Sequence, residues 1–188
     1  MPTRYFQLTD DMYLPNRWEL GTLDGPDGVP VQPALLRSGT PLSLKGRLKV
    51  AIEEPGGPLD FTHAPYSIPI VHVRVASLLT EQSPDEVQFL PVDIPSQPDQ
   101  YLVLNALRLI RCIDDARSSE VRYWEPEDGM PEKLGTYFSI AGLRIDPTKA
   151  GGARMFRTWG WPGALIVSED LKQALEQSGA TGMKFTPV

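Results

Sequence analysis

The sequence predicts an α+β fold with a largely antiparallel sheet and a few short helices. Two segments, 70–92 and 166–188, align without a gap, and each has apolar residues at helical spacing followed by a run that alternates like a strand. The 19 prolines break the remaining chain too often for long helices. Strands and turns are therefore expected around these two similar helix-strand units.

Residues 1–60 are predicted to form a region of strands and loops that packs on an α+β domain at 61–188, so that the 188 residues make one compact unit. Segments 23–33 and 53–60 are rich in Pro and Gly, which is typical of loops. The strands expected in this region are 4–8, 18–20 and 48–52. Between the two units, strands are expected at 101–110, 120–124, 137–145 and 154–158.

Each helix-strand unit carries its own helix signals. The apolar positions at helical spacing are Val71, Val75, Leu78 and Leu79 in the first unit and Val167, Leu171, Ala174 and Leu175 in the second. Ser168 is expected to cap the second helix through its hydroxyl group, and Gly179 to follow the last turn. His72 takes the place of Ser168 in the first unit, so a capping or surface role is expected for it.

Charge and composition restrict the class of partner. The chain carries 24 acidic and 18 basic residues, a net charge of −6, which argues against nucleic acid or an anionic membrane as a partner and fits a basic protein. No apolar run approaches the ~18 residues of a membrane span, and the N-terminus lacks a basic leader, so a cytoplasmic protein is expected. The single Cys112 fits that reducing setting as a small buried residue.

Few residues are suited to catalysis or to cofactor binding. The two histidines, His63 and His72, lie in no nucleophile elbow, zincin helix or metal-ligand pattern. Segment 149–154 is faintly like a phosphate loop but lacks the Walker spacing, so a turn is expected there. We therefore expect a protein that is not an enzyme and that uses neither a metal nor a cofactor.

Acidic residues concentrate between positions 114 and 132, which hold seven carboxylates and only two arginines. A solvated acidic face and a protein-binding surface both fit this pattern. Use of the carboxylates as general acid and base would require them to meet in a pocket. Asp114 also lies where it can cap a turn after the strand expected at 101–110.

Two tryptophans, Trp159 and Trp161, flank Gly160 in a run of aromatic and turn-forming residues. We expect one ring to lie in the core beneath the final helix. Exposure of the other ring at a partner surface is the less favoured alternative, which stays open because Trp is enriched at interface hot spots.

Short motifs in a fixed order resemble one bacterial family. They are Phe89 with Pro91-Val92, the Leu104-Asn105 strand, Asp114 with Ser119, Phe156-Arg157, and the closing Val167-Ser168 helix with Gly182 and Phe185. The set covers 65–188 and is similar to immunity protein family eleven of bacterial polymorphic toxin systems, formerly a domain of unknown function. The resemblance implies a non-enzymatic protein that binds and neutralises a cognate toxin, usually encoded by the adjacent gene.

The clustering of charge and of aromatic residues, and not the resemblance, predicts which residues form the toxin-binding surface. They are Asp114, Asp115, Glu120, Glu125, Glu127, Asp128, Trp159 and Trp161. An acidic rim speeds encounter with a basic toxin, and a desolvated aromatic side chain anchors it. Two other classes stay open from the residues alone: a small hydrolase or transferase that uses carboxylates such as Asp114 and Asp115, and a generic protein-interaction module.

Overall fold

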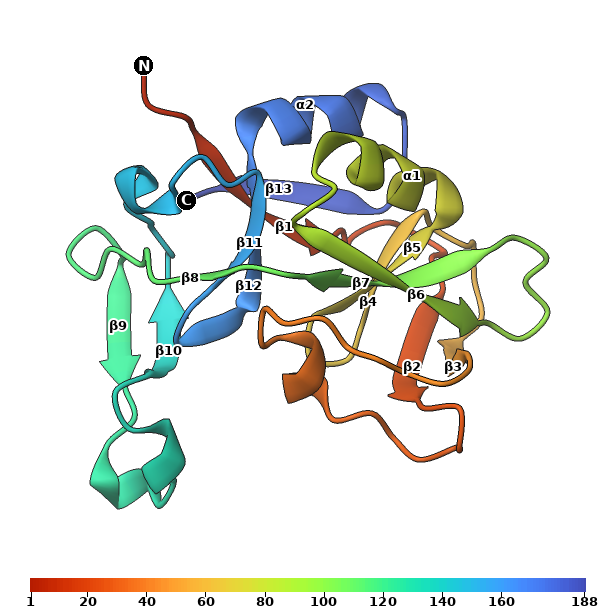
Figure 1. The fold of residues 1–188 in the computed structure, drawn as a ribbon, viewed down its shortest axis with the longest axis horizontal. Helices are drawn as coiled ribbons and strands as arrows, with labels where there is room; N and C mark the ends of the chain where they lie inside the picture. The colour runs from red at the N-terminus through yellow and green to blue at the C-terminus, as the bar shows by residue number, and fades with distance from the viewer.

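The computed structural model of the protein describes all residues, 1–188, and contains 13 strands, two α-helices and four short 3-10 helices (Figure 1). The strands form sheets of six, five and two strands. Only two strand pairs are parallel, so the predicted α+β fold with a largely antiparallel sheet is confirmed. Neither α-helix is long and apolar enough to cross a membrane.

The six-stranded sheet combines strands from the N-terminal region with the first helix-strand unit. Its spatial order is β2 (Glu19–Asp24), β3 (Leu48–Glu54), β6 (Val87–Asp93), β7 (Tyr101–Ala106), β5 (Ile68–His72) and β4 (Phe61–Ala64). Helix α1 (Val73–Gln82) connects β5 to β6. The strands predicted at 18–20 and 48–52 correspond to β2 and β3, whereas β4 has no counterpart among the predicted strands.

The five-stranded sheet contains the second helix-strand unit. Its order is β13 (Met183–Pro187), β1 (Tyr5–Asp10), β12 (Trp161–Ser168), β11 (Met155–Thr158) and β8 (Leu109–Ile110). Helix α2 (Glu169–Gln177) connects β12 to β13. The third sheet is a ribbon of β9 (Glu120–Tyr123) and β10 (Tyr137–Ala141).

Both helix-strand units fold as a strand, a helix and a second strand, with a third strand inserted between the two. In the first unit β7 lies between β5 and β6, and in the second unit β1 lies between β12 and β13. The register is also the same, because Tyr101 pairs with His72 and Tyr5 pairs with Ser168. Tyr5 precedes Tyr101 by the same 96 residues that relate the two segments. The N-terminal strand therefore completes the C-terminal unit.

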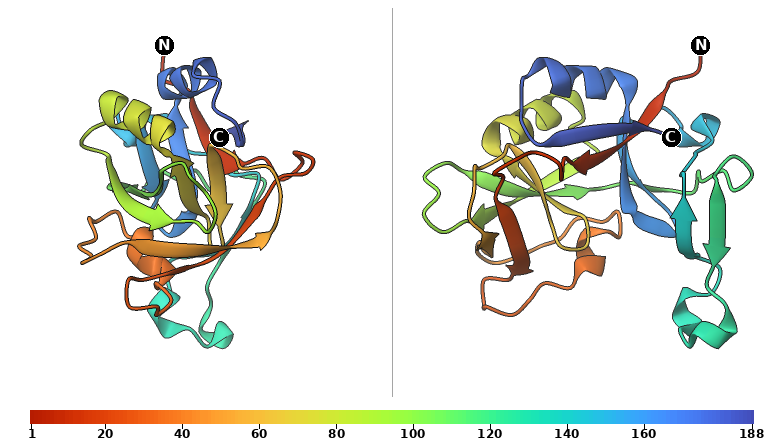
Figure 2. Two further views of the ribbon diagram at one scale, coloured as in Figure 1. Left: turned by 90° about the vertical axis from the view of Figure 1, so that its right-hand side faces the viewer. Right: turned by 180° about the vertical axis from the view of Figure 1, so that it is seen from behind.

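Helices α1 and α2 lie side by side on one side of the molecule and cover the same apolar cluster (Figure 2). Their buried residues in that cluster include Val75, Leu79, Leu171 and Leu175, as the spacing predicts. The prediction that Val71 belongs to the apolar face of the first helix, and Val167 to that of the second, is wrong. Both lie in strands, β5 and β12, because each helix begins two residues later.

The helix ends follow the predicted pattern with one exception. His72 caps α1, since its Nδ1 accepts a hydrogen bond from the Arg74 N–H (3.1 Å). Gly179 follows α2 with a φ of 69°, a conformation that suits glycine. The hydroxyl cap predicted for Ser168 is wrong, although Ser168 does occupy the N-cap position. Its hydroxyl donates to the Asp170 carboxylate instead, because a charged acceptor forms the stronger hydrogen bond.

Two predicted strands are longer than the strands observed. The strand expected at 101–110 divides at Leu107, whose N–H donates to the Glu86 carbonyl (2.9 Å), and the two parts lie in different sheets. The strand expected at 137–145 ends at Ala141. Gly142 follows with a φ of 57°, which turns the chain out of the extended conformation.

The two large sheets meet where β4 lies beside the turn that precedes β13. The Phe61 N–H donates to the Thr181 carbonyl (3.0 Å), and the Asp11 N–H donates to the Gly182 carbonyl (2.8 Å). Gly182 has a φ of 95°, and a Cβ at this position would lie 2.2 Å from the Phe61 carbonyl oxygen. Only glycine fits this junction.

Two further apolar clusters complete the interior. One joins the N-terminal region to the six-stranded sheet around Trp18, which is buried and donates its indole N–H to the Thr62 hydroxyl (2.8 Å). The other surrounds Cys112 beside the five-stranded sheet. The predicted burial of Cys112 is confirmed, and this burial raises the pKa of its thiol to about 12.

Candidate functional site

Residues 120–141 form an arm that projects from the body of the protein (Figure 1, lower left). The arm consists of β9, β10 and a tip with two 3-10 helices, η2 (Pro126–Asp128) and η3 (Pro131–Lys133). Its two strands pair only with each other. Where β10 begins, the Tyr137 N–H donates to the Gly160 carbonyl (3.1 Å), which fixes the arm to the turn between β11 and β12.

Aromatic side chains pair across the strands of the arm. Tyr123 and Tyr137 stack with their ring centroids 4.8 Å apart, and Trp124 meets Phe138 edge to face at 4.6 Å. The two pairs lie on opposite faces of the ribbon because adjacent residues of a strand point in opposite directions. Each such cross-strand pair stabilises a ribbon by about 0.2–1 kcal/mol.

Cations cover the tryptophan face of the arm. The guanidinium of Arg122 lies 4.0 Å from the ring centroid of Phe138, and the Lys133 ammonium lies 4.5 Å from the ring centroid of Trp124. Contacts of this kind contribute about 0.5–1 kcal/mol at exposed sites. They hold the aromatic rings in one orientation while leaving them close to solvent.

The tyrosine face is tied to the loop before β9 through Asp115. Both tyrosine hydroxyls donate to its carboxylate, with the Tyr137 Oη 2.7 Å from the carboxylate oxygen. Burial, the tyrosine pair and the negative charge of Asp115 raise the pKa of Tyr137, and the hydrogen bond to Asp115 raises the pKa of Tyr123. Both hydroxyls therefore stay protonated as donors near neutral pH.

The arm exposes apolar side chains to solvent. They are Tyr123 (41 % exposed), Met130 (37 %), Leu134 (45 %) and Phe138 (36 %). Four of the ten large apolar side chains exposed in the whole protein thus lie on 22 of its 188 residues. A concentration of exposed apolar residues of this kind is typical of an interaction site.

The structure brings the eight residues of the predicted site to the arm and its base. Glu120 lies in β9, and Glu125, Glu127 and Asp128 lie at the tip. Asp114 and Asp115 lie in the loop before β9, and Trp159 and Trp161 flank the turn that holds Tyr137.

Three of the predicted acids have partners within the protein. The Asp114 carboxylate accepts a hydrogen bond from the Arg117 N–H (3.1 Å) and so caps a turn. Asp115 accepts hydrogen bonds from the two tyrosine hydroxyls, and Asp128 forms an ion pair with Arg122 (2.8 Å). No group of three or more His, Cys, Asp or Glu side chains is arranged to hold a metal ion. The other three predicted acids, Glu120, Glu125 and Glu127, are exposed and form no ion pair.

Both tryptophans of the predicted site are half-buried, so the expectation of a core ring beneath the final helix is wrong. Trp161 packs on the cluster around Cys112 and not beneath α2, whose buried residues belong to a different cluster. The Arg111 guanidinium lies 4.2 Å from the ring centroid of Trp159 and covers it.

Sequence reasoning missed the four aromatic residues of the arm. A signal was present, because two adjacent aromatic residues occur in each of the segments expected as strands at 120–124 and 137–145. A Pro- and Gly-rich stretch separates the two segments, which is typical of a hairpin with a long loop. The missed residues are Tyr123, Trp124, Tyr137 and Phe138.

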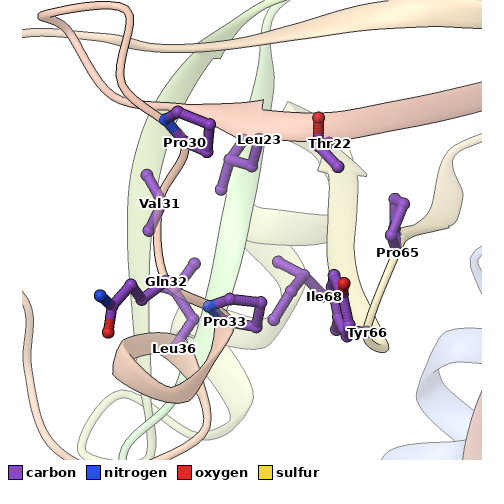
Figure 3. A pocket seen from close by; sticks show the side chains of 10 residues that line it. All are labelled: Thr22, Leu23, Pro30, Val31, Gln32, Pro33, Leu36, Pro65, Tyr66 and Ile68. Carbon is purple, nitrogen blue, oxygen red and sulfur yellow. The ribbon is translucent and has the colours of Figure 1, made fainter.

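A second surface feature is a hollow of about 250 Å³ beside Tyr66 (Figure 3). It lies between β2, the segment 30–36 and the turn that connects β4 to β5. None of the eight residues of the predicted site lines it. The residues that do are Thr22, Leu23, Pro30, Val31, Gln32, Pro33, Leu36, Pro65, Tyr66 and Ile68.

Comparison with known proteins identifies the family. Residues 13–188 match the immunity protein family (Imm11). The match begins well before residue 65, where the resemblance seen in the sequence starts, so most of the N-terminal region also follows the family pattern. No curated protein matches the chain. The match covers nearly the whole sequence, and the chain therefore belongs to the immunity protein family Imm11.

Proposed function

We propose that this protein protects the cell that produces it by binding a cognate toxin in the cytoplasm and neutralising it, and that the arm makes the main contact. Membership of the immunity protein family supports the role. The observation that carries the assignment of the surface is the set of aromatic and apolar side chains exposed on the arm. Tyr and Trp are enriched among the residues that dominate binding energy at interfaces.

The internal contacts of the arm favour tight binding. The two aromatic pairs, the Arg122–Asp128 ion pair and the hydrogen bonds to Asp115 fix the arm in one conformation before it meets a partner. A preorganised surface loses little conformational freedom on association, so more of the contact energy appears as affinity. Asp115 and Asp128 would thus support the surface, and the exposed rings would make the contact.

Charge supports a basic partner. Glu120, Glu125 and Glu127 are exposed along the arm, and the whole chain has a net charge of −6. Exposed charges at the rim of an interface mainly raise the association rate of a partner of opposite sign. The proposed toxin therefore presents a basic surface around the place where the arm binds.

The shape of the arm favours a concave surface on the toxin. The arm is a ribbon of only two strands, and both of its faces carry an aromatic pair. The tyrosine face is held at Asp115 and at the Gly160 turn, so the tryptophan face and the tip are the parts open to a partner, and a concave partner would contact both. We infer that the arm enters a cleft of the toxin.

Co-expression tests this proposal. The C-terminal domain encoded by the adjacent gene is expressed in a sensitive host with and without this protein, and the two chains are then co-purified. Restored growth together with a stable complex is the expected result. A toxic domain that is neither bound nor counteracted by this protein would contradict the proposal.

A further inference from the structure

The hollow beside Tyr66 has rigid, mainly apolar walls (Figure 3). Three prolines line it, Pro30, Pro33 and Pro65, and the side chains of Leu23 and Leu36 that line it are anchored in the cluster around Trp18. No charged residue lines it, although the chain holds 24 acids. Its volume of about 250 Å³ is below the ~300–1,000 Å³ of small-molecule sites and suits a single side chain.

The turn at the rim of this hollow has an unusual backbone. Tyr66 and Ser67 have φ values of 66° and 59°, in a region that residues other than glycine rarely adopt. Two arginines hold the turn: Arg37 donates to the Tyr66 carbonyl (3.1 Å), and Arg157 donates to the Ser67 carbonyl (2.9 Å). This arrangement presents the Tyr66 side chain to solvent, where 63 % of the residue is exposed. Strained residues held in this way are typical of binding sites.

The two arginines leave positive charge without a partner. Neither Arg37 nor Arg157 lies within 4.0 Å of a carboxylate oxygen, and the Nε of each is buried without a hydrogen-bond partner. Arg157 is fully buried, and this burial together with the charge of Arg37 lowers its pKa to about 9. An anionic group near Arg37 would offset the repulsion between the positive charges of Arg37 and Arg157.

The hollow and the arm are linked through Arg157. Its guanidinium donates to the Ser67 carbonyl at the rim of the hollow and also to the Pro162 carbonyl (2.8 Å). Pro162 is the second residue of β12 and directly follows the turn whose Gly160 carbonyl accepts a hydrogen bond from the Tyr137 N–H of the arm. One buried side chain thus connects the Tyr66 turn to the turn that carries the arm.

We propose that the hollow beside Tyr66 is a second contact for the toxin and receives an apolar side chain of the toxin with a carboxylate next to it, which faces Arg37. The inference rests on the proposed function, and it specifies the chemistry of the toxin segment that the protein recognises. The apolar walls fit the side chain, and the unpaired arginine charge fits the carboxylate. The arm then provides contact with a basic cleft, and the hollow selects one acidic, apolar segment.

Photocrosslinking tests the occupant of the hollow. The variant Tyr66→p-benzoylphenylalanine is mixed with the toxin domain encoded by the adjacent gene, irradiated and analysed by peptide mass spectrometry. The expected crosslink is to a toxin peptide with an apolar residue next to Asp or Glu. Tyr13→p-benzoylphenylalanine is the control, because Tyr13 is also exposed (85 %) but does not line the hollow. A crosslink at Tyr13 alone, or at neither site, would overturn the inference.

Affinity measurements test the same contact independently. Thr22 is exposed on β2 and lines the hollow, so Thr22→Trp fills the hollow without altering the core. We expect this variant to weaken toxin binding at least ~30-fold, the effect of blocking an interface hot spot. The control is Thr186→Trp, which makes the same change at an exposed position of β13. Circular dichroism shows whether each variant keeps the fold.

The outcomes separate the two proposals. If the wild-type protein binds the toxin and Thr22→Trp binds equally well, the hollow plays no part and the proposed function stands. If the wild-type protein does not bind the toxin, the proposed function fails and the inference falls with it. Weaker binding by Thr22→Trp but not by Thr186→Trp supports the inference.

Discussion

Tyr5 and Tyr101 occupy equivalent positions in the two helix-strand units. Each lies in the strand inserted between the two outer strands of its unit, and each is buried. Each hydroxyl donates to a backbone carbonyl at 3.1 Å, that of Tyr5 to Ala153 and that of Tyr101 to Leu59. Two copies of one local design therefore build three strands of each large sheet, and the N-terminal strand is a structural part of the C-terminal unit.

This equivalence predicts equal losses of stability for Tyr5→Phe and Tyr101→Phe. Each variant removes a hydroxyl and leaves a buried carbonyl without its donor, which costs about 1–3 kcal/mol. Urea denaturation measures the free energy of unfolding. The exposed Tyr13 provides the control, since Tyr13→Phe removes a hydroxyl in solvent. An unchanged stability of either core variant would show that its hydroxyl is not a structural donor.

The environment of His63 predicts that the protein loses stability in mild acid. Burial lowers the pKa of His63 to about 4 against the attraction of Asp10, and the charges of Arg157 and Arg17 add to the lowering. In the unfolded chain, histidine titrates near 6.5. Between these values only the unfolded state binds the proton, so stability present above pH ~6.5 decreases as the pH falls towards 4, by about 3 kcal/mol in total.

The measurement for His63 is the free energy of unfolding from pH 7 to 4. His63→Gln is expected to remove this part of the pH dependence, and His72→Gln serves as the control because His72 is the only other histidine. If His63→Gln and the wild-type protein lose stability in parallel over this range, another group titrates instead of His63.

Two tryptophans are expected to have opposite roles. Trp124→Ala on the arm should weaken toxin binding by about 2 kcal/mol or more and change stability little, because its ring pairs with Phe138 and Lys133 of the arm and belongs to none of the core clusters. Trp18→Ala should cost about 3–5 kcal/mol of stability, because Trp18 is buried and bonded to Thr62. Calorimetric titration and thermal denaturation measure the two effects. Normal toxin affinity in Trp124→Ala would show that this ring does not contribute to toxin binding.

The free acids of the arm should act on the rate of association. The double variant Glu125→Lys and Glu127→Lys is expected to slow toxin association roughly tenfold at low salt and to leave dissociation almost unchanged. The difference should disappear at 1 M salt, where charges are screened beyond ~3 Å. Glu53→Lys with Glu54→Lys makes the same charge change on β3 and is the matched control. Equal slowing by both pairs would indicate a response to net charge instead of a local acidic surface.

The sequence predicts those features of the fold that depend on local periodicity. The helices, the strand after each helix, the His72 cap and the Gly179 terminus all follow from residues close together in the chain. The role of β1 does not follow from nearby residues, because β1 joins its unit from the opposite end of the chain. Its six residues match those of β7 only at Tyr5/Tyr101 and Leu8/Leu104.

The candidate site also depends on contacts between residues that are far apart in the chain, which local patterns do not predict. The acids between 114 and 132 were visible as a cluster, but the aromatic pairs depend on the register of β9 and β10, which shifts between Tyr137 and Ser139. The hollow beside Tyr66 joins residues 22–36 to residues 65–68, and the pairing of distant segments cannot be read from local patterns. Long-range register and packing, rather than propensity, decide where these side chains meet.

Removal of the tip of the arm tests the central claim most directly. Tyr123 and Tyr137 are paired across the ribbon, so residues 124–136 can be replaced by Asn-Gly, which forms a tight hairpin turn. The shortened protein should keep its thermal stability, because the body makes its own core, but its affinity for the toxin domain, measured by calorimetric titration, should fall at least ~100-fold. A folded, shortened protein that binds the toxin as tightly as the wild type would show that the arm is not the binding surface.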